Sequence, residues 1–222
     1  MRLLGSVPPT PEKLIWLNGP FGGGKTQTAH ELSRRSPGSV ICDPEQAGFG
    51  MRRMLPPPLR TDFQNLRSWR EGVVEILDLV LRKHNGPVIV PMTVVNPEYL
   101  KETVGRLRDM DHEVHHFSLL ARRETVLKRL RERGFGHVVQ FVAGKNATLA
   151  RETWAMSKVD ECLTRLQDPE FATRVWTDDL TVKEVADHVA AKAGVHLTPN
   201  TDTRLRGYAR RTWTSLKHIR FD

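Results

Sequence analysis

Residues 19–26 read GPFGGGKT, a run whose residue types and spacing suit the binding of phosphate groups. Its glycines allow positive φ angles that turn backbone N–H groups toward an anion, and a helix-compatible stretch follows directly. Lys25 should reach the β- and γ-phosphates of a nucleoside triphosphate, and the Thr26 hydroxyl is the expected Mg²⁺ ligand. An apolar run precedes this segment, as the motif requires, so the sequence predicts a phosphate-binding loop for ATP. The expected nucleotide contacts are Gly19, Pro20, Phe21, Gly22, Gly23, Gly24, Lys25, Thr26 and Gln27.

Two further groups could complete a site for phosphoryl transfer, which depends mostly on positioning and on charge neutralisation. Asp43 ends a predicted strand, and ligands of parallel sheets bind beyond the carboxyl ends of the strands. It could accept the proton of an acceptor hydroxyl or hold Mg²⁺ through water; the alternative is that it only caps the next helix. Arg129 and Arg133 lie four residues apart on one side of a predicted helix and are expected to act on the transferred phosphoryl group. The alternative is that they are solvated surface residues.

Candidate substrate contacts lie mainly in an insertion predicted over residues 44–86. Arg52 and Arg53 could bind an anionic or polar group of the substrate. A second group supplies a carboxylate, an amide and two aromatic rings, from Asp62, Phe63, Gln64 and Trp69. This mixture suits the binding of a base or a sugar. The same mixture is equally typical of core aromatics beside surface polar groups.

Polar residues in two predicted strands have less specific interpretations. Thr93, at the end of the third strand, could touch a ligand or merely satisfy the strand end. His115 and His116 lie within the fourth strand, where neighbouring side chains point to opposite faces. We therefore predict a structural role for both histidines and no shared metal.

The elements that position these residues alternate between apolar strands and amphipathic helices. Apolar runs without alternation are typical of parallel strands buried on both faces, so we predict an α/β fold with a doubly wound, five-stranded parallel sheet. Thr181 and Glu184 form a capping box before the last helix of this unit. The predicted strands are 13–18, 39–43, 87–95, 113–121 and 174–177, with helices over 27–35, from Trp69, and from Asn96-Pro97.

Composition limits the classes of protein that this chain can represent. At 222 residues it should hold one α/β domain over residues 13–200, preceded by an arm at 1–12 and carrying a basic lid at 131–150. The net charge of +8 indicates anionic partners without choosing among them. The two cysteines have neither disulfide nor metal-ligand spacing, which favours a cytoplasmic protein. The sequence contains no uninterrupted apolar run of about 18 residues, so we predict no membrane span.

The last segment, residues 201–222, combines apolar residues at helical spacing with many arginines and lysines. Such a basic amphipathic helix can lie on an anionic membrane or bind nucleic acid, although docking of its apolar face on the core is the commoner arrangement. Nucleic acid is the least favoured of these partners, and the oligomeric state stays open.

The chain resembles the tunicamycin-resistance ATP-binding proteins of bacteria in several stretches, which together span nearly all of it after residue 13. The resemblance implies a fold similar to nucleoside and nucleotide kinases, ATP binding, protection against tunicamycin-type nucleoside antibiotics, and peripheral membrane contact through the C-terminal helix. Residues 134–142, GFGHVVQFV, depart from the family pattern by adding length to the lid. The stretches that carry the resemblance are 15–32, 43–49, 62–64, 88–100, 105–107, 115–120, 124–131 and 216–220.

Together these features predict a small-molecule kinase that uses MgATP to phosphorylate a hydroxyl of a tunicamycin-like nucleoside antibiotic. Lys25 and the loop would hold the phosphates, Thr26 the magnesium and Asp43 the acceptor hydroxyl. The alternative is an ATP-dependent protein that sequesters the drug at the inner face of the membrane without chemistry.

Overall fold

Five parallel strands form the central sheet in a computed structural model that describes residues 13–132, 158–171 and 173–200. The strand order is β2-β3-β1-β4-β5, with β1 in the middle. This arrangement confirms the predicted doubly wound α/β fold. The strands are β1 (Lys13–Asn18), β2 (Val40–Ile41), β3 (Val88–Pro91), β4 (Glu113–Leu120) and β5 (Arg174–Trp176).

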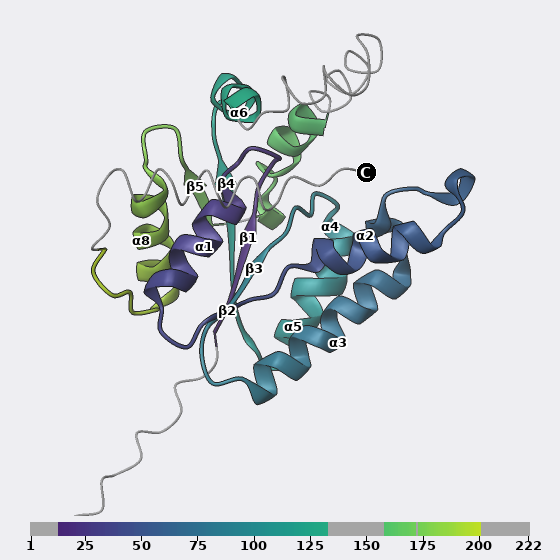
Figure 1. Ribbon diagram of the computed structural model, residues 1–222, viewed down its shortest axis with the longest axis horizontal. Coiled ribbons are helices and arrows are strands. Elements are labelled where there is room, and N and C mark those ends of the chain that lie inside the picture. The colour runs from purple at the N-terminus through teal and green to yellow at the C-terminus, as the bar shows by residue number, and fades with distance from the viewer. Residues whose placement is uncertain (1–12, 133–157, 172, 201–222) are drawn as a thin grey trace, which may run out of the picture.

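Helices cover both faces of the sheet (Figure 1). The first and last helices, α1 and α8, lie on one face, and α3 and α5 lie on the other with α2 beside them. The helices are α1 (Lys25–Arg35), α2 (Pro44–Met54), α3 (Arg67–Lys83), α4 (Pro97–Leu100), α5 (Arg106–Asp109), α6 (Arg123–Leu130) and α8 (Val182–Ala193), with a further helix over 158–165. A π-helical turn at Lys101–Gly105 joins α4 to α5, and 3₁₀ turns occur at Pro57–Leu59, Phe63–Asn65 and Pro169–Phe171.

The central strand explains why its sequence is apolar without alternation. Leu14 and Trp16 belong to the core cluster on the α3 side, whereas Ile15 and Leu17 belong to the cluster on the α1 and α8 side. All four side chains are at most 1 % exposed. A strand buried on both faces needs apolar residues at every position.

Several boundaries differ from the sequence prediction, and each difference has a local cause. The second strand is only Val40–Ile41, because Asp43 already caps α2. The third strand ends at Pro91, because the Asn18 side chain takes over the backbone hydrogen bonds of Val94. The predicted arm at 1–12, the lid from residue 133 and the helix at 201–222 lie outside the described residues.

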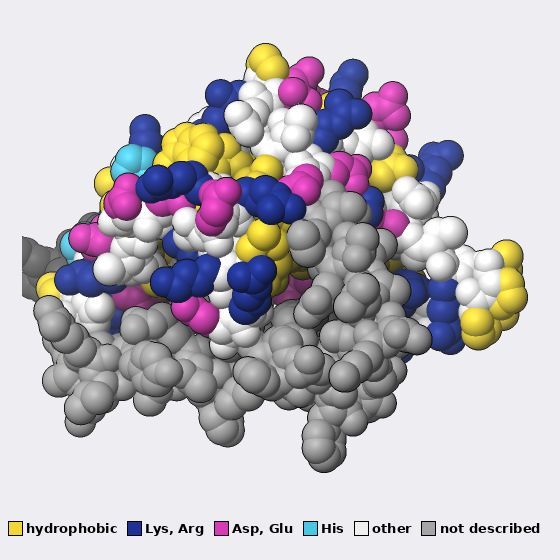
Figure 2. All heavy atoms as spheres, turned by 90° about the horizontal axis from the view of Figure 1, so that it is seen from above, with side chains coloured by type: hydrophobic (Ala, Val, Ile, Leu, Met, Phe, Trp, Pro, Cys, Tyr) yellow, Lys and Arg dark blue, Asp and Glu magenta, His cyan; other side chains and the backbone are white. Residues whose placement is uncertain are grey.

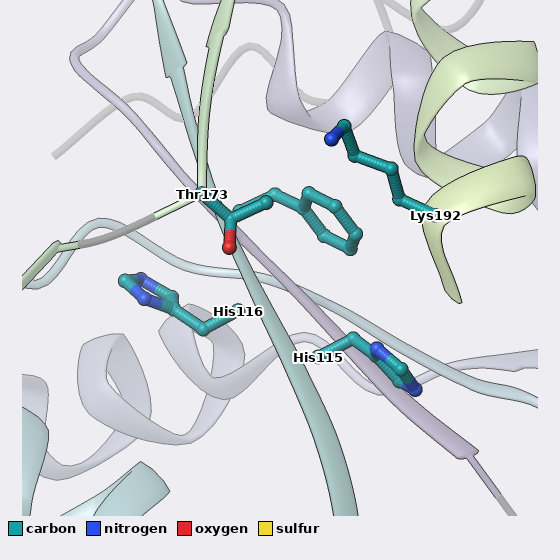
Figure 3. A pocket seen from close by; sticks show the side chains of 5 residues that line it. His115, His116, Thr173 and Lys192 are labelled. Atoms are coloured by element: carbon teal, nitrogen blue, oxygen red, sulfur yellow. The ribbon is translucent and has the colours of Figure 1, made fainter.

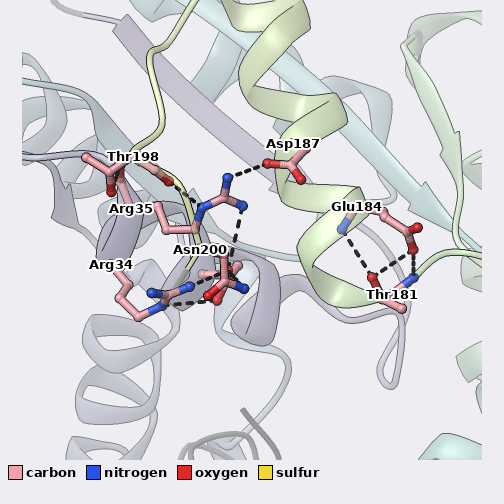
Figure 4. Close-up of polar contacts among 8 residues, drawn as sticks. Arg34, Arg35, Thr181, Glu184, Asp187, Thr198 and Asn200 are labelled. Atoms are coloured by element: carbon pink, nitrogen blue, oxygen red, sulfur yellow. Dashed lines mark hydrogen bonds and ion pairs between the residues drawn. The ribbon is translucent and has the colours of Figure 1, made fainter. Parts of the chain in front are cut away.

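The segment after α8 returns to the last turn of α1 and is held there by a polar clasp (Figure 4). The Arg35 side chain donates to the Thr198 carbonyl at 2.9 Å and forms an ion pair of 2.6 Å with Asp187. In return, the Thr198 N–H donates to the Arg35 carbonyl at 2.7 Å. The chain up to Thr198 is therefore tied to the C-terminal end of α1.

The helix α8 begins at the predicted capping box. The Glu184 N–H donates to the Thr181 hydroxyl, and the Thr181 N–H donates to the Glu184 carboxylate at 2.8 Å. Within the described ranges, no helix is both long and apolar enough to cross a membrane.

Candidate active site

The loop between β1 and α1 has the backbone geometry of an anion cradle. Gly19 has φ +151°, and a Cβ there would lie 2.7 Å from the Leu119 carbonyl oxygen, so only glycine fits. Gly24 is left-handed at φ +93° and caps α1 without a side-chain hydrogen bond. The first turn of α1 also contains no acidic residue. Because a helix leaves its first N–H groups without intrahelical partners, this N-terminus is suited to phosphate oxygens.

Lys25 folds back across the loop. Its ammonium donates to the Gly19 carbonyl at 2.8 Å and to the Pro20 carbonyl at 3.0 Å, and the side chain is almost wholly buried. The Phe21 ring lies 5.8 Å from the same ammonium. The cation is thus kept at the loop by two neutral carbonyls, which phosphate oxygens can replace.

A buried asparagine fixes the start of the loop. The Asn18 Oδ1 accepts the N–H groups of Gly19 at 2.8 Å and Val94 at 3.0 Å. Its Nδ2 donates to the Val94 carbonyl at 2.7 Å and contacts His116 Nε2 at 3.3 Å. One completely buried side chain therefore joins the end of β1 to the segment after β3 and to β4.

Thr93, a candidate ligand contact, also supports the loop. Its hydroxyl donates to the Gly19 carbonyl at 2.8 Å, and the residue is 6 % exposed. The Gly19 carbonyl thus accepts from both Thr93 and Lys25. The structure favours the alternative reading, in which this hydroxyl satisfies a neighbouring backbone group.

His116 must be neutral to accept from Asn18, and its surroundings favour this state. Burial, with a smaller contribution from the Arg108 charge, lowers the pKa of His116 to about 4. Figure 3 shows His115 and His116 directed to different sides of β4, beside a shallow pocket that Lys192 also lines. His115 contacts the Glu113 carboxylate at 2.7 Å. The predicted structural reading of both histidines fits this geometry, and no cluster of three metal-ligating His, Cys, Asp or Glu residues occurs in the described part of the chain.

Asp43 lies beyond the carboxyl end of β2, with β3 between it and the phosphate-binding loop. Its Oδ1 accepts the Glu45 N–H at 3.0 Å, which makes it the N-cap of α2. The cap fixes the orientation of the carboxylate at this edge of the sheet. Thr26, the second residue of α1, lies at the loop itself.

The predicted substrate residues are not gathered at one surface. Arg52 and Arg53 lie in the last turn of α2, roughly 14 Å along the helix from Asp43. Asp62 is exposed and caps the turn at Phe63–Asn65, while the Gln64 carbonyl accepts from the Arg70 guanidinium.

The two aromatic candidates require a correction, because they belong to the core. Trp69 is completely buried and its indole N–H donates to the Pro44 carbonyl at 3.0 Å. Phe63 packs 5.2 Å from Trp69 between ring centroids and covers Gly48, where a Cβ would lie 2.3 Å from the ring. Both rings position α2 and the turn after it, as in the alternative reading of the sequence.

Arg129, near the end of α6, has a specific partner at the carboxyl end of β5. Arg129 donates to the Thr177 hydroxyl at 3.0 Å and to the Thr177 carbonyl at 2.7 Å. Partial burial lowers the pKa of its guanidinium, although the Asp178 charge opposes this effect. Arg133, its predicted partner, lies outside the described residues.

Asp178 was not predicted, yet it holds α6 in place. Its carboxylate accepts the Arg122 N–H at 3.0 Å and the Thr125 hydroxyl at 2.7 Å. Burial raises the pKa of Asp178, but these hydrogen bonds and the Arg122 charge outweigh it and leave the pKa below its usual range. The sequence offered only weak signals for the two residues that the prediction missed. Asn18 is an asparagine at the end of an apolar strand, and Asp178 belongs to an acidic pair directly after the last predicted strand.

The comparisons with known proteins agree with this geometry. The family described as AAA domain matches residues 14–155. The tunicamycin resistance protein of Deinococcus radiodurans is 31% identical, with a TM-score of 0.67 and coverage of 85% of this chain and 100% of that chain. No curated protein matches the sequence.

Two kinases share the fold at lower identity. The APS kinase of Mycobacterium tuberculosis, solved with AMPPNP and APS, has a TM-score of 0.54 at 16% identity, covering 82% of this chain and 98% of its own. A gluconokinase from Sinorhizobium meliloti has a TM-score of 0.51 at 16% identity, covering 95% and 98%. These likenesses show a P-loop, kinase-like fold. The chain belongs to the AAA domain family and to the family of the tunicamycin resistance protein of Deinococcus radiodurans.

Proposed function

We propose that this protein is an ATP-dependent phosphotransferase that acts on a hydroxyl of a tunicamycin-type nucleoside antibiotic. The observation that carries the proposal is the placement of a fixed carboxylate, Asp43, at the same edge of the sheet as a built phosphate cradle. The substrate class rests on the identity to the Deinococcus tunicamycin resistance protein over the whole of that chain.

Nucleotide binding would replace the contacts that now occupy Lys25. The ammonium would leave the Gly19 and Pro20 carbonyls for the β- and γ-phosphate oxygens, while the N–H groups at the start of α1 take the remaining oxygens. Thr26 would hold Mg²⁺, which neutralises charge on the phosphates when bound. Gly19 is kept in place during this exchange by Asn18 and Thr93.

Transfer would then break the bond between the γ-phosphorus and the bridging oxygen and form a bond to the drug hydroxyl. Asp43, oriented by the Glu45 N–H, would accept the hydroxyl proton, and ADP would leave. Arg129 and Arg133 are proposed to neutralise charge on the moving phosphoryl group, which requires Arg129 to give up its bonds to Thr177.

The deciding experiment is incubation of the protein with tunicamycin, ATP and Mg²⁺, followed by mass measurement of the drug. We expect a gain of one phosphate. Asp43→Asn keeps an oxygen that accepts the Glu45 N–H, so the cap survives while the base is lost. We therefore expect unchanged thermal stability and a rate lower by about 10²–10⁴-fold.

Asp111→Asn is the matched control, because it removes one exposed carboxylate in a left-handed turn that asparagine also tolerates. It should leave the rate unchanged. Separate calorimetry of ATP binding should show at least ~10-fold weaker affinity for Lys25→Ala. Drug of unchanged mass, bound only when ATP is present, would instead establish the sequestering protein.

A further inference from the structure

The chain from the end of α2 through the 3₁₀ turn η1 (Pro57–Leu59) to Arg60 carries an exposed apolar cluster. The proposed chemistry does not use this cluster. This insertion tip, residues 54–60, reads MLPPPLR. Met54 is 84% exposed and Leu59 60%, and the three prolines between them are exposed as well. Figure 2 shows a yellow apolar group projecting at the right-hand end of the molecule, which is the outer end of this insertion in Figure 1.

The backbone N–H groups of the tip are hydrogen-bonded or, at the prolines, absent. Prolines 56, 57 and 58 have no N–H. The N–H groups of Leu55, Leu59, Arg60 and Thr61 all donate to carbonyls within the turn, at 2.9–3.2 Å. The Arg60 side chain also donates to the Leu55 carbonyl at 2.9 Å. An ordinary exposed loop would leave several N–H groups without partners on entering an apolar medium, and this one leaves none between residues 55 and 61.

The charged side chains within residues 52–60 have a single sign. Residues 52–60 include three arginines, Arg52, Arg53 and Arg60, and no acidic residue. Arg53 and Arg60 are exposed on the same turn as Met54 and Leu59. Long arginine side chains can lay their stems along apolar surface and keep the charge at an interface with water.

We propose that the insertion tip enters the interfacial layer of an anionic phospholipid bilayer, with Met54 and Leu59 among the acyl chains and the arginines at the phosphates. The cluster offers only a few side chains, far below the area of about 1,000 Å² that a specific protein interface needs. A bilayer requires no complementary shape, and its anionic headgroups match the positive collar. The site differs from the predicted helix at 201–222, so the two contacts can be tested separately.

The test measures sedimentation of the full chain with vesicles of phosphatidylglycerol and phosphatidylcholine. We expect binding to the anionic vesicles that weakens at high salt, and little binding to phosphatidylcholine alone. Met54→Ser with Leu59→Ser should weaken binding by about 10-fold or more, because both side chains lose their burial in the bilayer. These residues are exposed, so the thermal stability of the double variant should equal that of the wild type.

The matched control is Ile76→Ser with Leu79→Ser, which removes two apolar side chains of similar exposure, 53% and 59%, from α3. Vesicle binding should not change. Cysteine placed at position 54 and labelled with an environment-sensitive dye should shift to the blue on adding vesicles, whereas the same label at position 76 should not.

Two results would overturn the proposal. The first is equal vesicle binding of the wild type and the Met54→Ser, Leu59→Ser variant, which would assign membrane contact to another part of the chain or deny it. The second is a dimer in sedimentation velocity without lipid that the same double substitution abolishes, which would make the tip a contact between two copies.

Discussion

Replacement of Asn18 by leucine would remove the polar groups that fix the start of the phosphate-binding loop while keeping the same branched arrangement of four heavy atoms in the side chain. The Gly19 and Val94 N–H groups would lose their acceptor, and the Val94 carbonyl would lose its donor. Each buried N–H without a partner costs about 1–3 kcal/mol, so we expect a loss of roughly 2–6 kcal/mol. The total stability of such a domain is only about 5–15 kcal/mol.

Urea denaturation followed by circular dichroism would measure this loss, and calorimetry would measure ATP binding. We expect ATP affinity to fall by about tenfold, because Gly19 is the first residue of the loop. Thr93→Val is the matched control, since the Gly19 carbonyl still accepts from Lys25 after the hydroxyl is gone, and it should cost about 1 kcal/mol or less. A loss below about 1 kcal/mol for Asn18→Leu would refute the assigned role of this asparagine.

Three further outcomes follow from other contacts. The pKa of His116 is about 4 in the folded protein against 6.5 when unfolded, so protonation favours unfolding. The full stability is therefore present above pH 6.5, and the free energy of unfolding should fall by about 2 kcal/mol from pH 7 to pH 5. In urea titrations, His116→Gln should reduce this dependence on pH. Gly48→Ala should cost about 1–3 kcal/mol in thermal or urea unfolding, because its methyl group would collide with Phe63, whereas Gly50→Ala meets no atom within 4 Å and should stabilise α2 slightly; equal effects would contradict this packing. Arg35→Met should speed amide hydrogen exchange in the segment after α8 without changing exchange in β1, and unchanged exchange there would show that the clasp is not what holds that segment.

The sequence was most informative where the structure is determined by neighbours along the chain. The apolar run before the loop predicted β1 with its correct bounds, and the glycine spacing predicted the anion cradle. Thr181 and Glu184 predicted the start of α8, because a capping box spans only four residues.

Contacts between distant residues were beyond such reasoning. Asn18 meets Val94 and His116, which are 76 and 98 residues away, and the register that unites them exists only in the folded sheet. Trp69 was ambiguous for the same reason: its helical spacing predicted an apolar face, but whether that face met substrate or core depended on α2.

The clasp between Arg35 and Thr198 also locates a practical boundary in the chain. The helix α1 is 11 residues long, about 16 Å, with the phosphate-binding loop at one end and the clasp at the other. A chain cut directly after α8 would remove Thr198 and leave the buried Arg35 side chain without one of its acceptors. A chain cut after residue 200 keeps both partners, so of these two truncated chains only the shorter one would weaken the end of α1 that lies far from the phosphate-binding loop.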